Sequence, residues 1–393
     1  MTTFAPLNEE EVCDVVRWAA SQNEALAIAG SGSRAEFGYQ VKTNHGISVK
    51  EISGIRDYDP RELVLTAGAG TPLREIQATL AAQGQQLAFE PPDPAALFGS
   101  AHSGTLGGVF MGNQSGPRRI HAGAARDHIL GVRAVNGSGE LWKSGGKVIK
   151  NVTGYDLSKL LAGSWGTLSI VTEISCKVLP MAPRTRTVSV PALDAASALR
   201  VLTCMVSSVF SPTGLAWLPT SLDTGGGGRC LIRLEGTESA LAERITAMAA
   251  ILETGMPHQI ITDPEATSLW QAVRDASPVA HCPVVLKLSL PPALTPDIAN
   301  TLTERGVKTW YLDAAGAWIW IGVENEVAAD LVQTLRAQLN GHGAAVIMRG
   351  PEAIKTAAGV LTLPAPALAA LTHRLKQSFD PLSLFNPGRL YPV

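Results

Sequence analysis

Apolar residues recur with a helical period at the start of the chain. Between residues 12 and 19 they follow the spacing i, i+3, i+4, i+7, which places them on one face of a helix. Asn8 stands where a helix cap would accept a hydrogen bond, and Glu11 follows three residues later, as in a capping box. The pattern therefore predicts an N-terminal helix that buries one face.

Shorter apolar runs follow, and they predict strands at residues 25–29, 47–49 and 63–67. A second helix is expected to begin at Thr71-Pro72, with Thr71 as its cap, and to end at Gly84. A further strand at 129–135 leads through Asn136-Gly137, a turn pair typical of hairpins, into a partner strand at residues 140–142.

The second half of the chain alternates between longer elements. A proline-rich stretch around 181–192 is expected to leave the first domain. The patterns beyond it predict helices at 193–206, 237–255, 295–305 and 325–340, and strands at 213–217, 229–235, 283–290, 307–312, 317–322 and 344–348. This order predicts an α+β domain, in which an antiparallel sheet carries helices on one side. A last helix is expected from Pro366 to Phe379.

Composition narrows the class of protein. The 393 residues are 46% hydrophobic and 17% charged, with a formal net charge of −2. Nucleic acid is not an expected partner, because no long basic stripe is present. The N-terminus lacks a signal-peptide pattern, and no apolar run approaches the ~18 residues of a membrane helix. We therefore expect a cytoplasmic protein, peripheral to the inner membrane only through partners.

The cysteines do not form a metal-binding or disulfide pattern. They are odd in number and widely scattered, at Cys13, Cys176, Cys204, Cys230 and Cys282. Without a C-x-x-C pair, the pattern argues against an iron–sulfur cluster, a structural zinc site or a disulfide framework in this chain. We expect no bound metal, and we interpret the cysteines as small buried apolar side chains.

One glycine-rich loop matches a dinucleotide motif. Gly30 to Ala35 fits G-x-G-x-x-A, the fingerprint of a Rossmann fold. That fold requires a helix that begins at the loop, whereas residues 36–41 contain a glycine and no helical apolar period. The alternatives are a loop whose consecutive backbone N–H groups bind a phosphate, and a plain tight turn between strands. The loop alone does not decide between them.

Residues 90–123 are rich in glycine, proline and serine and lie between well-patterned strands, which favours a segment that wraps a ligand. Together with the loop at 30, the chain contains an ordered series of motifs: Phe37-Gly38, Glu90 to Pro94, Gly104 to Gly108, Gly112 to Arg118, Arg126 to Gly131, Lys150 to Leu160, Gly163 to Leu168 and Phe385 to Arg389. This series resembles the FAD-binding domain of the vanillyl-alcohol oxidase and para-cresol methylhydroxylase (PCMH) type. More narrowly, it resembles the D-2-hydroxyacid dehydrogenase branch and the related FAD-binding subunit of glycolate oxidase.

The resemblance implies a two-subdomain PCMH-type FAD-binding domain at residues 1–180 and an α+β cap domain at 181–365. A C-terminal helix and tail, 366–393, would return to the first domain. The implied cofactor-binding residues are Gly30, Ser31, Gly32, Ser33, Arg34, Gly38, Pro92, Thr105, Leu106, Gly107, Gly108, Asn113, Ser115, Gly116, Arg118, Gly163, Gly166, Thr167, Val171 and Asn386. Backbone N–H groups at 30–34 and 105–108 would bind the phosphates of FAD.

The sequence also departs from that family. Relatives that bind FAD covalently do so through a His in the first loop or a Cys after the second. Residues 29–38 contain no His and residues 100–128 contain no Cys, so we expect non-covalent FAD. Trp165 stands where the family has an acidic residue, and His121-Ala122-Gly123 replaces an aromatic residue before a glycine.

The second half lacks the family's H-x-G-D-G-N-x-H motif, and its histidines have no metal-ligand spacing. No catalytic residue is therefore assigned. This asymmetry resembles the FAD-binding subunit of a glycolate oxidase complex that converts glycolate to glyoxylate. Such a subunit acts beside a second FAD-containing subunit and an iron–sulfur subunit. The alternatives are a stand-alone FAD-dependent dehydrogenase of D-lactate or a similar 2-hydroxy acid, and an FAD-binding structural subunit without redox turnover.

Overall fold

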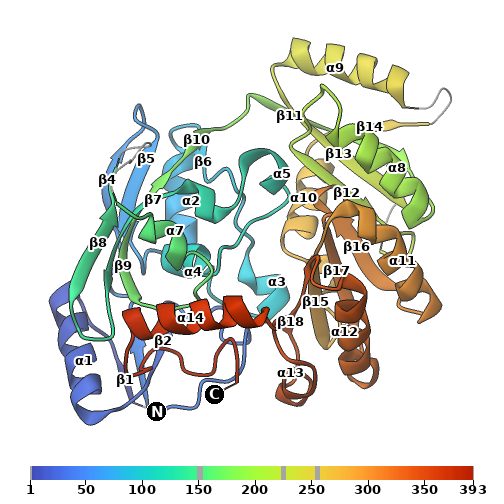
Figure 1. The fold of residues 1–393 in the computed structure, drawn as a ribbon. Coiled ribbons are helices and arrows are strands. Elements are labelled where there is room, and N and C mark those ends of the chain that lie inside the picture. The colour runs from blue at the N-terminus through green and yellow to red at the C-terminus, as the bar shows by residue number, and fades with distance from the viewer. Residues whose placement is uncertain (1, 148–153, 223–226, 253–256, 393) are drawn as a thin grey trace. The chain divides into compact units, whose positions relative to one another are not determined.

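The computed structural model describes residues 2–147, 154–222, 227–252 and 257–392, which form two compact units (Figure 1). The first unit comprises Met1–Gln114, Gly123–Met181 and Leu363–Val393, and the second comprises Ser115–Ala122 and Ala182–Thr362. Although the sequence analysis placed residues 115–122 in the first domain, they pack with the second unit. There Arg118 forms an ion pair with Glu235.

The first unit contains two sheets. One is a three-stranded parallel sheet in the order β1 (Thr2–Phe4), β3 (His45–Ser48) and β2 (Leu26–Ala29). Helix α1 (Glu9–Gln22) shares its core, which contains Val12, Val16 and Leu26. The expected Asn8 cap is confirmed, but the Glu11 carboxylate accepts the N–H of Leu7 and not that of Asn8, so the full capping box does not form. The Asn8 side chain accepts the Glu11 N–H at 3.0 Å, and the Glu11 carboxylate accepts the Leu7 N–H at 2.8 Å.

The other is a five-stranded antiparallel sheet. Its order is β4 (Ile55–Asp59), β5 (Val64–Gly68), β9 (Ile170–Lys177), β7 (Ile129–Val135) and β8 (Leu141–Gly145). Strands β6 (Gln85–Gln86) and β10 (Leu179–Pro180) form a separate pair. Helix α2 (Leu73–Ala81) packs into the same core through Ile76 and Leu80. The predicted Thr71 cap is wrong. Pro72 occupies that position, and the Thr71 hydroxyl donates to the Gly68 carbonyl at 2.7 Å instead.

The glycine-rich segment contains several short helices that the sequence pattern did not reveal. They are α3 (Pro94–Phe98), α4 (Leu106–Met111), α5 (Arg119–Ala122) and α6 (Ala125–His128), and α7 (Leu157–Leu161) follows later. With four to six residues each, they complete fewer than two turns. Apolar periodicity cannot be recognised over so few residues.

The second unit is built on one eight-stranded antiparallel sheet. Its order is β14 (Gln259–Ile261), β11 (Arg184–Pro191), β13 (Arg229–Gly236), β12 (Gly214–Leu218), β16 (Thr309–Asp313), β17 (Trp318–Val323), β15 (Val284–Ser289) and β18 (Ala344–Arg349). The stretch at 181–192, expected only to leave the first domain, therefore contains a full strand. Its buried residues, among them Val188 and Val190, pack in the sheet core.

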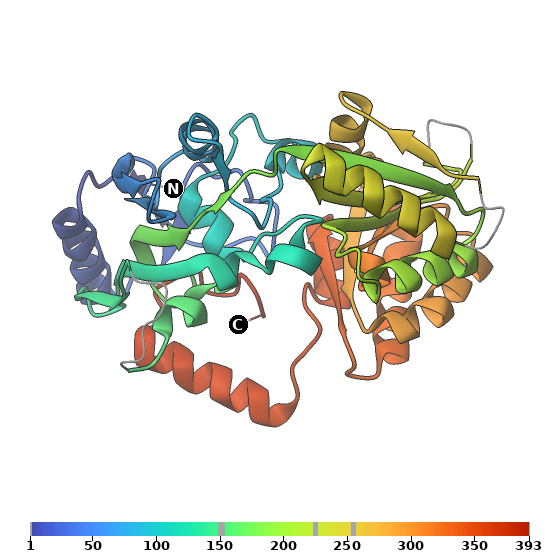
Figure 2. The ribbon, with the colours of Figure 1, turned by 90° about the horizontal axis from the view of Figure 1, so that it is seen from above.

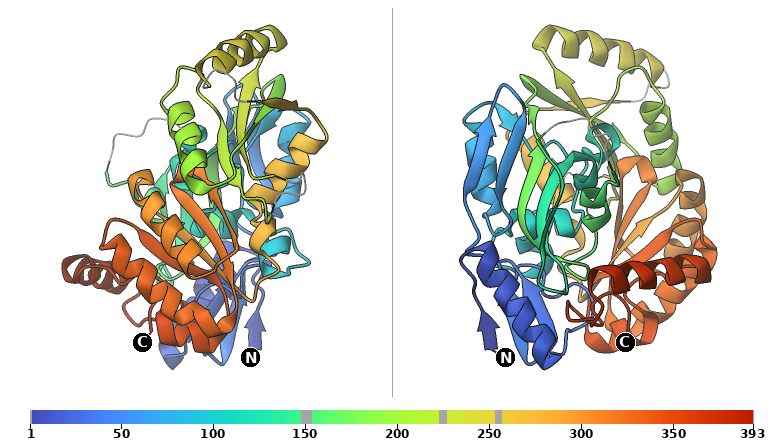
Figure 3. Two further views of the ribbon diagram at one scale, coloured as in Figure 1. Left: turned by 90° about the vertical axis from the view of Figure 1, so that its right-hand side faces the viewer. Right: turned by 60° about the vertical axis from the view of Figure 1, so that its left-hand side comes forward.

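Helices cover one face of that sheet. The principal ones are α8 (Ala195–Val206), α9 (Glu238–Ile251), α11 (Thr295–Glu304) and α12 (Asn325–Leu339), and their apolar faces share a core with alternate strand residues such as Leu286, Leu288, Ile319 and Ile321. Helices α8, α11 and α12 lie along one side of the sheet in Figure 3. Helix α13 (Glu352–Ala358) follows β18. Helix α10 (Glu265–Arg274) contacts the opposite face, where Trp270 stacks against Arg233 at 4.5 Å. The expected antiparallel α+β architecture is confirmed.

The chain returns to the first unit through helix α14 (Pro366–Phe379). The C-terminal end of α14 meets the β7–β8 hairpin, where the Phe379 and Trp142 rings lie 5.6 Å apart (Figure 2). Among the helices of the described residues, none has both the length and the apolar character needed to cross a bilayer.

Candidate functional site

The loop after β2 presents unused backbone donors. The chain continues from Gly30 through turns and does not enter a helix, as predicted. Within the described parts of the chain, the N–H groups of Ser31, Gly32, Ser33 and Arg34 have no hydrogen-bond acceptor. The Ser31 hydroxyl is also buried without a partner. Ser33 and Arg34 are buried, where an unpaired donor costs free energy, so four successive unused N–H groups here indicate a site that an anion would complete.

Arg34 places a positive charge beside this loop. Its side chain is 6% exposed and donates to the Pro92 carbonyl at 3.2 Å and to the Ser33 hydroxyl at 3.4 Å. No described carboxylate lies within ion-pair distance of it. Burial lowers the pKa of Arg34 to about 10, and the charge of Asp93 opposes this shift. The guanidinium is therefore protonated at neutral pH and forms no ion pair with a described carboxylate.

The second glycine stretch packs directly on the first. A Cβ atom at Gly30 would lie 2.5 Å from Oγ1 of Thr105, and one at Gly104 would lie 2.7 Å from Nη1 of Arg34. Both distances are below 3.0 Å, so a larger residue at either position would force the Thr105 or Arg34 side chain to move. The structure therefore brings together the stretches near residues 30 and 105, which are separated by about 75 residues of sequence.

Of the phosphate donors expected at 105–108, those at 106–108 are already engaged within the chain. The N–H groups of Leu106, Gly107 and Gly108 donate to Thr71 O, Ala69 O and Thr105 Oγ1, at 2.9, 2.8 and 3.2 Å. A Cβ atom at Gly107 would lie 2.9 Å from the Ala69 carbonyl oxygen. Gly107 therefore allows α4 to pack closely on the chain beyond β5. The free donors of the site lie at 31–34.

The third glycine stretch, Gly163 to Leu168, contacts the segments around both of the other stretches. The N–H groups of Gly163 and Trp165 donate to the Met111 carbonyl at 2.9 and 3.0 Å. The Trp165 ring stacks on Phe37, with centroids 3.7 Å apart and planes 14° apart. The aromatic residue that replaces the family's acidic residue thus packs against the loop region after Arg34.

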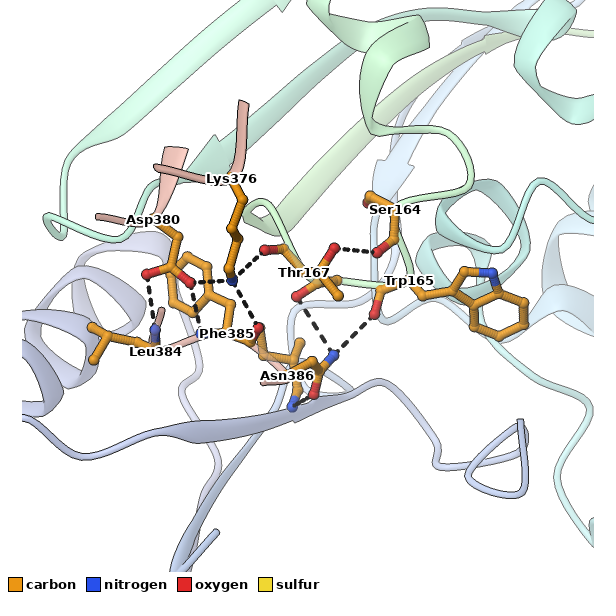
Figure 4. Close-up of polar contacts among 10 residues, drawn as sticks. Ser164, Trp165, Thr167, Lys376, Asp380, Leu384, Phe385 and Asn386 are labelled. Carbon is orange, nitrogen blue, oxygen red and sulfur yellow. Dashed lines mark hydrogen bonds and ion pairs between the residues drawn. The ribbon is translucent and has the colours of Figure 1, made fainter. Parts of the chain in front are cut away.

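A C-terminal clamp, formed by Lys376, Asp380 and Asn386, holds the third stretch (Figure 4). Asn386 donates to the Trp165 carbonyl at 2.9 Å and accepts the Ile28 N–H at 2.8 Å. The Lys376 ammonium donates to the Thr167 carbonyl at 2.7 Å and to the buried Asp380 carboxylate at 2.5 Å. Asn386 was expected to contact the cofactor. In the structure its side chain joins two segments of the site.

The remaining predicted residues have varied surroundings. A Cβ atom at Gly38 would lie 2.4 Å from the Arg389 carbonyl oxygen, and one at Gly166 would lie 3.0 Å from Nδ2 of Asn386. Leu106 and Val171 lie in the apolar core of the five-stranded sheet, and Asn113 accepts the Arg126 N–H. Ser115, Gly116 and Arg118 belong to the second unit. Residues 150–153 of the quoted motif lie outside the described residues.

Arg389 is a site residue that the sequence analysis quoted within a motif but assigned no role. Its guanidinium donates to the Arg34 carbonyl at 3.0 Å and lies 5.8 Å from the centre of the Trp165 ring. Burial lowers the pKa of Arg389 to about 10. The side chain thus adds a second largely desolvated cation near the loop, and its place in the C-terminal motif was the only signal for it.

These features fit a ligand with adjacent phosphates. The site contains four unused N–H groups, a buried unpaired hydroxyl and the charge of Arg34, which forms no ion pair. All of these groups would be satisfied by negatively charged acceptors. At Gly32 a Cβ atom would have no neighbour within 4 Å, so space remains beside the donors. Within the described residues there is no group of side chains suited to hold a metal ion. The site therefore fits the pyrophosphate of FAD.

Comparisons with known proteins agree with this geometry. Residues 2–145 match the family model of an FAD binding domain. The chain is 33% identical to glycolate oxidase subunit GlcE of Escherichia coli (strain K12), over 97% of each chain. It is 32% identical to a D-lactate dehydrogenase of Archaeoglobus fulgidus, but that match covers only 44% of this chain and 38% of that protein.

Solved structures show the same fold. A p-cresol methylhydroxylase structure with bound substrate matches with a TM-score of 0.76 and 15% identity, covering 99% of this chain and 88% of that one. An alkyldihydroxyacetonephosphate synthase matches with a TM-score of 0.67 and 17% identity, covering 98% and 76%. This chain therefore belongs to the family of FAD-binding oxidoreductases that includes glycolate oxidase subunit GlcE.

Proposed function

We propose that this chain is the FAD-holding subunit of a complex that oxidises glycolate to glyoxylate. The observation that carries the proposal is the loop at 31–34, whose unused donors lie beside the unneutralised Arg34. The chain is similar to GlcE over 97% of both lengths, which extends the likeness to the second unit as well. Its partners would be a second FAD-containing subunit and an iron–sulfur subunit, and any membrane contact would be made through them.

The cofactor would be held without a covalent bond. Residues 29–38 contain no His and residues 100–128 contain no Cys, so neither loop has the usual attachment side chain. When bound, FAD would supply a redox centre that relays electrons between the partner subunits. The chain's own part is to bind the two phosphates through the N–H groups at 31–34 and to balance their charge with Arg34. Arg389 and the Phe37–Trp165 stack would shape the rest of the loop region.

A stand-alone dehydrogenase is less well supported than a subunit. The relatives named D-lactate dehydrogenase and D-2-hydroxyglutarate dehydrogenase match at most 45% of this chain. GlcD of Bacillus subtilis (strain 168) matches 70% of this chain, which spans 60% of that protein. The dehydrogenases therefore share less than half of this chain.

The test compares the purified chain with the assembled complex. Acid precipitation of the chain should release all its flavin into solution, because no covalent link holds it. Anaerobic glycolate should leave the flavin of the chain alone oxidised, and should reduce it when the partner subunits are present. Flavin that stays with the precipitate would contradict non-covalent binding.

Two other results would replace the proposal. Reduction of the isolated chain by glycolate would favour an independent dehydrogenase. The flavin of this chain could also stay in one oxidation state while the complex turns over glycolate. That result would favour a structural subunit.

A further inference from the structure

The segment 384–389 runs beside β2, the strand that leads into the loop with the unused donors. Leu26 on β2 is paired in parallel with Phe385. The Leu26 N–H donates to the Leu384 carbonyl at 2.7 Å, and the Leu26 carbonyl accepts the Asn386 N–H at 3.0 Å. The segment therefore extends the first sheet by a short stretch of backbone pairing and arrives close to residues 31–34, here called the donor loop.

A turn after Asn386 brings Arg389 against the chain that follows the donor loop. Asn386 and Gly388 adopt φ 43° and 75°, and the Arg389 N–H donates to the Asn386 carbonyl at 3.2 Å. The Arg389 carbonyl accepts the Tyr39 N–H at 2.9 Å. A Cβ atom at Gly38 would lie only 2.4 Å from the same carbonyl oxygen. The backbone of Arg389 is thus packed directly on residues 38 and 39.

The guanidinium of Arg389 contacts the donor loop itself. Its Nη2 atom donates to the Arg34 carbonyl at 3.0 Å, and the Phe37 N–H donates to the same oxygen at 3.2 Å. An anion site made of backbone N–H groups requires that neighbouring carbonyl oxygens, which carry partial negative charge, do not turn into it. The last carbonyl of the donor loop is held by two donors, so the conformation of the loop depends on Arg389.

The position of Arg389 is unfavourable for the stability of the fold. Its Nε atom is buried without a hydrogen-bond partner, and no described carboxylate lies within ion-pair distance of its guanidinium. Burial lowers the pKa of Arg389 to about 10, so the side chain is charged at neutral pH. A buried cation without a counter-charge destabilises the folded state. Such groups are concentrated at functional sites, which favours a role for Arg389 beyond stability.

We propose that Arg389 is a positioning residue for the binding of FAD. By holding the Arg34 carbonyl, its guanidinium fixes the donor loop in the conformation that leaves the N–H groups of 31–34 available to the phosphates. A loop that is already in its binding conformation loses less conformational entropy when the ligand arrives, and this increases affinity. The inference rests on the proposed function and adds a residue from the end of the chain to the groups that build its site.

The first measurement is the Kd for FAD of the full-length protein, by flavin fluorescence. Arg389→Met keeps an unbranched side chain but removes the donor, and the Kd should rise at least about tenfold. Arg389→Lys keeps a charged donor without the planar guanidinium and should recover part of the affinity. Arg74→Met is the matched control, because Arg74 is an exposed arginine on α2 of the same unit, and its Kd should equal that of the wild type.

The second measurement separates positioning from general stability. It is hydrogen–deuterium exchange of the FAD-free proteins. In the wild type, the Phe37 and Tyr39 N–H groups are bonded to the Arg34 and Arg389 carbonyls. Arg389→Met should make these two amides exchange faster, whereas the amides of the buried strand β7 should exchange as in the wild type. A side chain that only stabilised the whole fold would change exchange in β7 as well.

Three results would overturn the inference. The first is a folded Arg389→Met protein with the wild-type Kd. The second is a higher Kd with unchanged exchange at Phe37 and Tyr39, which would indicate a direct contact with the cofactor. The third is faster exchange throughout β7, which would indicate a general structural role. A wild-type chain that does not bind FAD contradicts the proposed function, whereas a chain that binds FAD equally well without Arg389 contradicts only this inference.

Discussion

At the scale of single residues, the candidate site depends on backbone groups more than on side chains. The loop at 31–34 contributes four unused N–H groups, and Gly32 adopts φ 73°, a left-handed conformation that glycine accepts without strain. Arg34 is a buried side chain that adds a full charge there. Substitutions at these positions should therefore affect FAD binding for different reasons, and matched controls can separate the reasons.

Gly32→Ala should weaken FAD binding beyond its effect on stability. A left-handed alanine costs about 1–2 kcal/mol, so the substitution should destabilise the FAD-free protein by that amount. Its Cβ would also occupy space beside the donors, and the Kd for FAD should rise at least about tenfold. Gly84→Ala is the control, because Gly84 has φ 65° and equally open surroundings. Equal Kd values for the two variants, measured by flavin fluorescence, would contradict the assignment.

Arg34→Met should weaken FAD binding without unfolding the protein. A charge-assisted hydrogen bond contributes about 1.5–3 kcal/mol, which corresponds to a roughly 10- to 150-fold higher Kd. Because the pKa of Arg34 is about 10, wild-type affinity should not change between pH 6 and ~8.5 through this group. Arg61→Met, at an exposed arginine, should leave the Kd unchanged. An Arg34→Met protein with wild-type affinity would remove Arg34 from the site.

The sequence identified these residue positions better than it identified their roles. The glycines at 30, 104 and 107 do stand where segments approach closely, and that requirement is visible as glycine in the sequence. The role of Gly107 was not predictable, because the atom that it approaches, the Ala69 carbonyl, belongs to a segment almost 40 residues away. The pairing of Lys376 with Asp380 and of Asn386 with Trp165 likewise requires knowledge of how the C-terminal segment returns.

At the scale of elements, long periodic segments were predictable and short ones were not. Helix α12 and the strands β15 to β18 lie within about two residues of their expected bounds, because each shows a full period of buried positions. Helices α3 to α6 escaped prediction because they are too short to show a period. Strand β11 escaped because prolines flank it, although its own residues Val188 and Val190 alternate.

Two polar contacts between elements should contribute measurably to stability. The first is the C-terminal clamp. Lys376→Met should destabilise the protein by about 3 kcal/mol, because it leaves the buried Asp380 carboxylate without its cation. Adding Asp380→Asn should cost less than the sum of the two single substitutions. Arg374→Met, exposed on the same helix, is the control. Additive effects in urea unfolding would show that the pair does not act as a unit.

The second contact joins α1 to the five-stranded sheet. Glu9 pairs with Arg133 and accepts a hydrogen bond from Thr172. The hydrogen bond from Arg133 is the main cause that lowers the pKa of Glu9 from its ordinary value of 4.5, against the opposing effect of burial. A carboxyl group whose pKa is lower in the folded than in the unfolded state stabilises the fold at pH values above its unfolded-state pKa. This stabilisation is lost as the pH falls through the folded-state pKa.

Glu9→Gln should therefore cost about 1 kcal/mol of unfolding free energy at pH 7. The difference from wild type should shrink as the pH falls below about 4.5. Glu10→Gln is the matched control, since Glu10 is exposed in the same first helical turn and loses the same helix-dipole interaction. Urea unfolding at several pH values measures both. A Glu9→Gln effect that does not depend on pH would contradict the paired-carboxylate explanation.

At the scale of the whole molecule, the two units contribute different things. The first brings three separate glycine-containing stretches and the C-terminal clamp to one loop with unused donors. The second carries Lys287, Trp318 and Trp320 on the side of its sheet that faces away from the principal helical core. The likeness to GlcE over 97% of both chains covers both units, whereas the likeness to D-lactate dehydrogenase covers 44% of this chain.

The central claim is that the N–H groups of Ser31 to Arg34 bind the phosphates of FAD. Hydrogen–deuterium exchange of the FAD-free and FAD-loaded chain tests it directly, because amides that gain an acceptor exchange more slowly. Peptides that cover 31–34 should become strongly protected when FAD binds, whereas Leu106 to Gly108, already bonded within the chain, should change little. The opposite result is that residues 31–34 exchange as fast in the FAD-loaded protein as in the FAD-free chain. That result would contradict the claim.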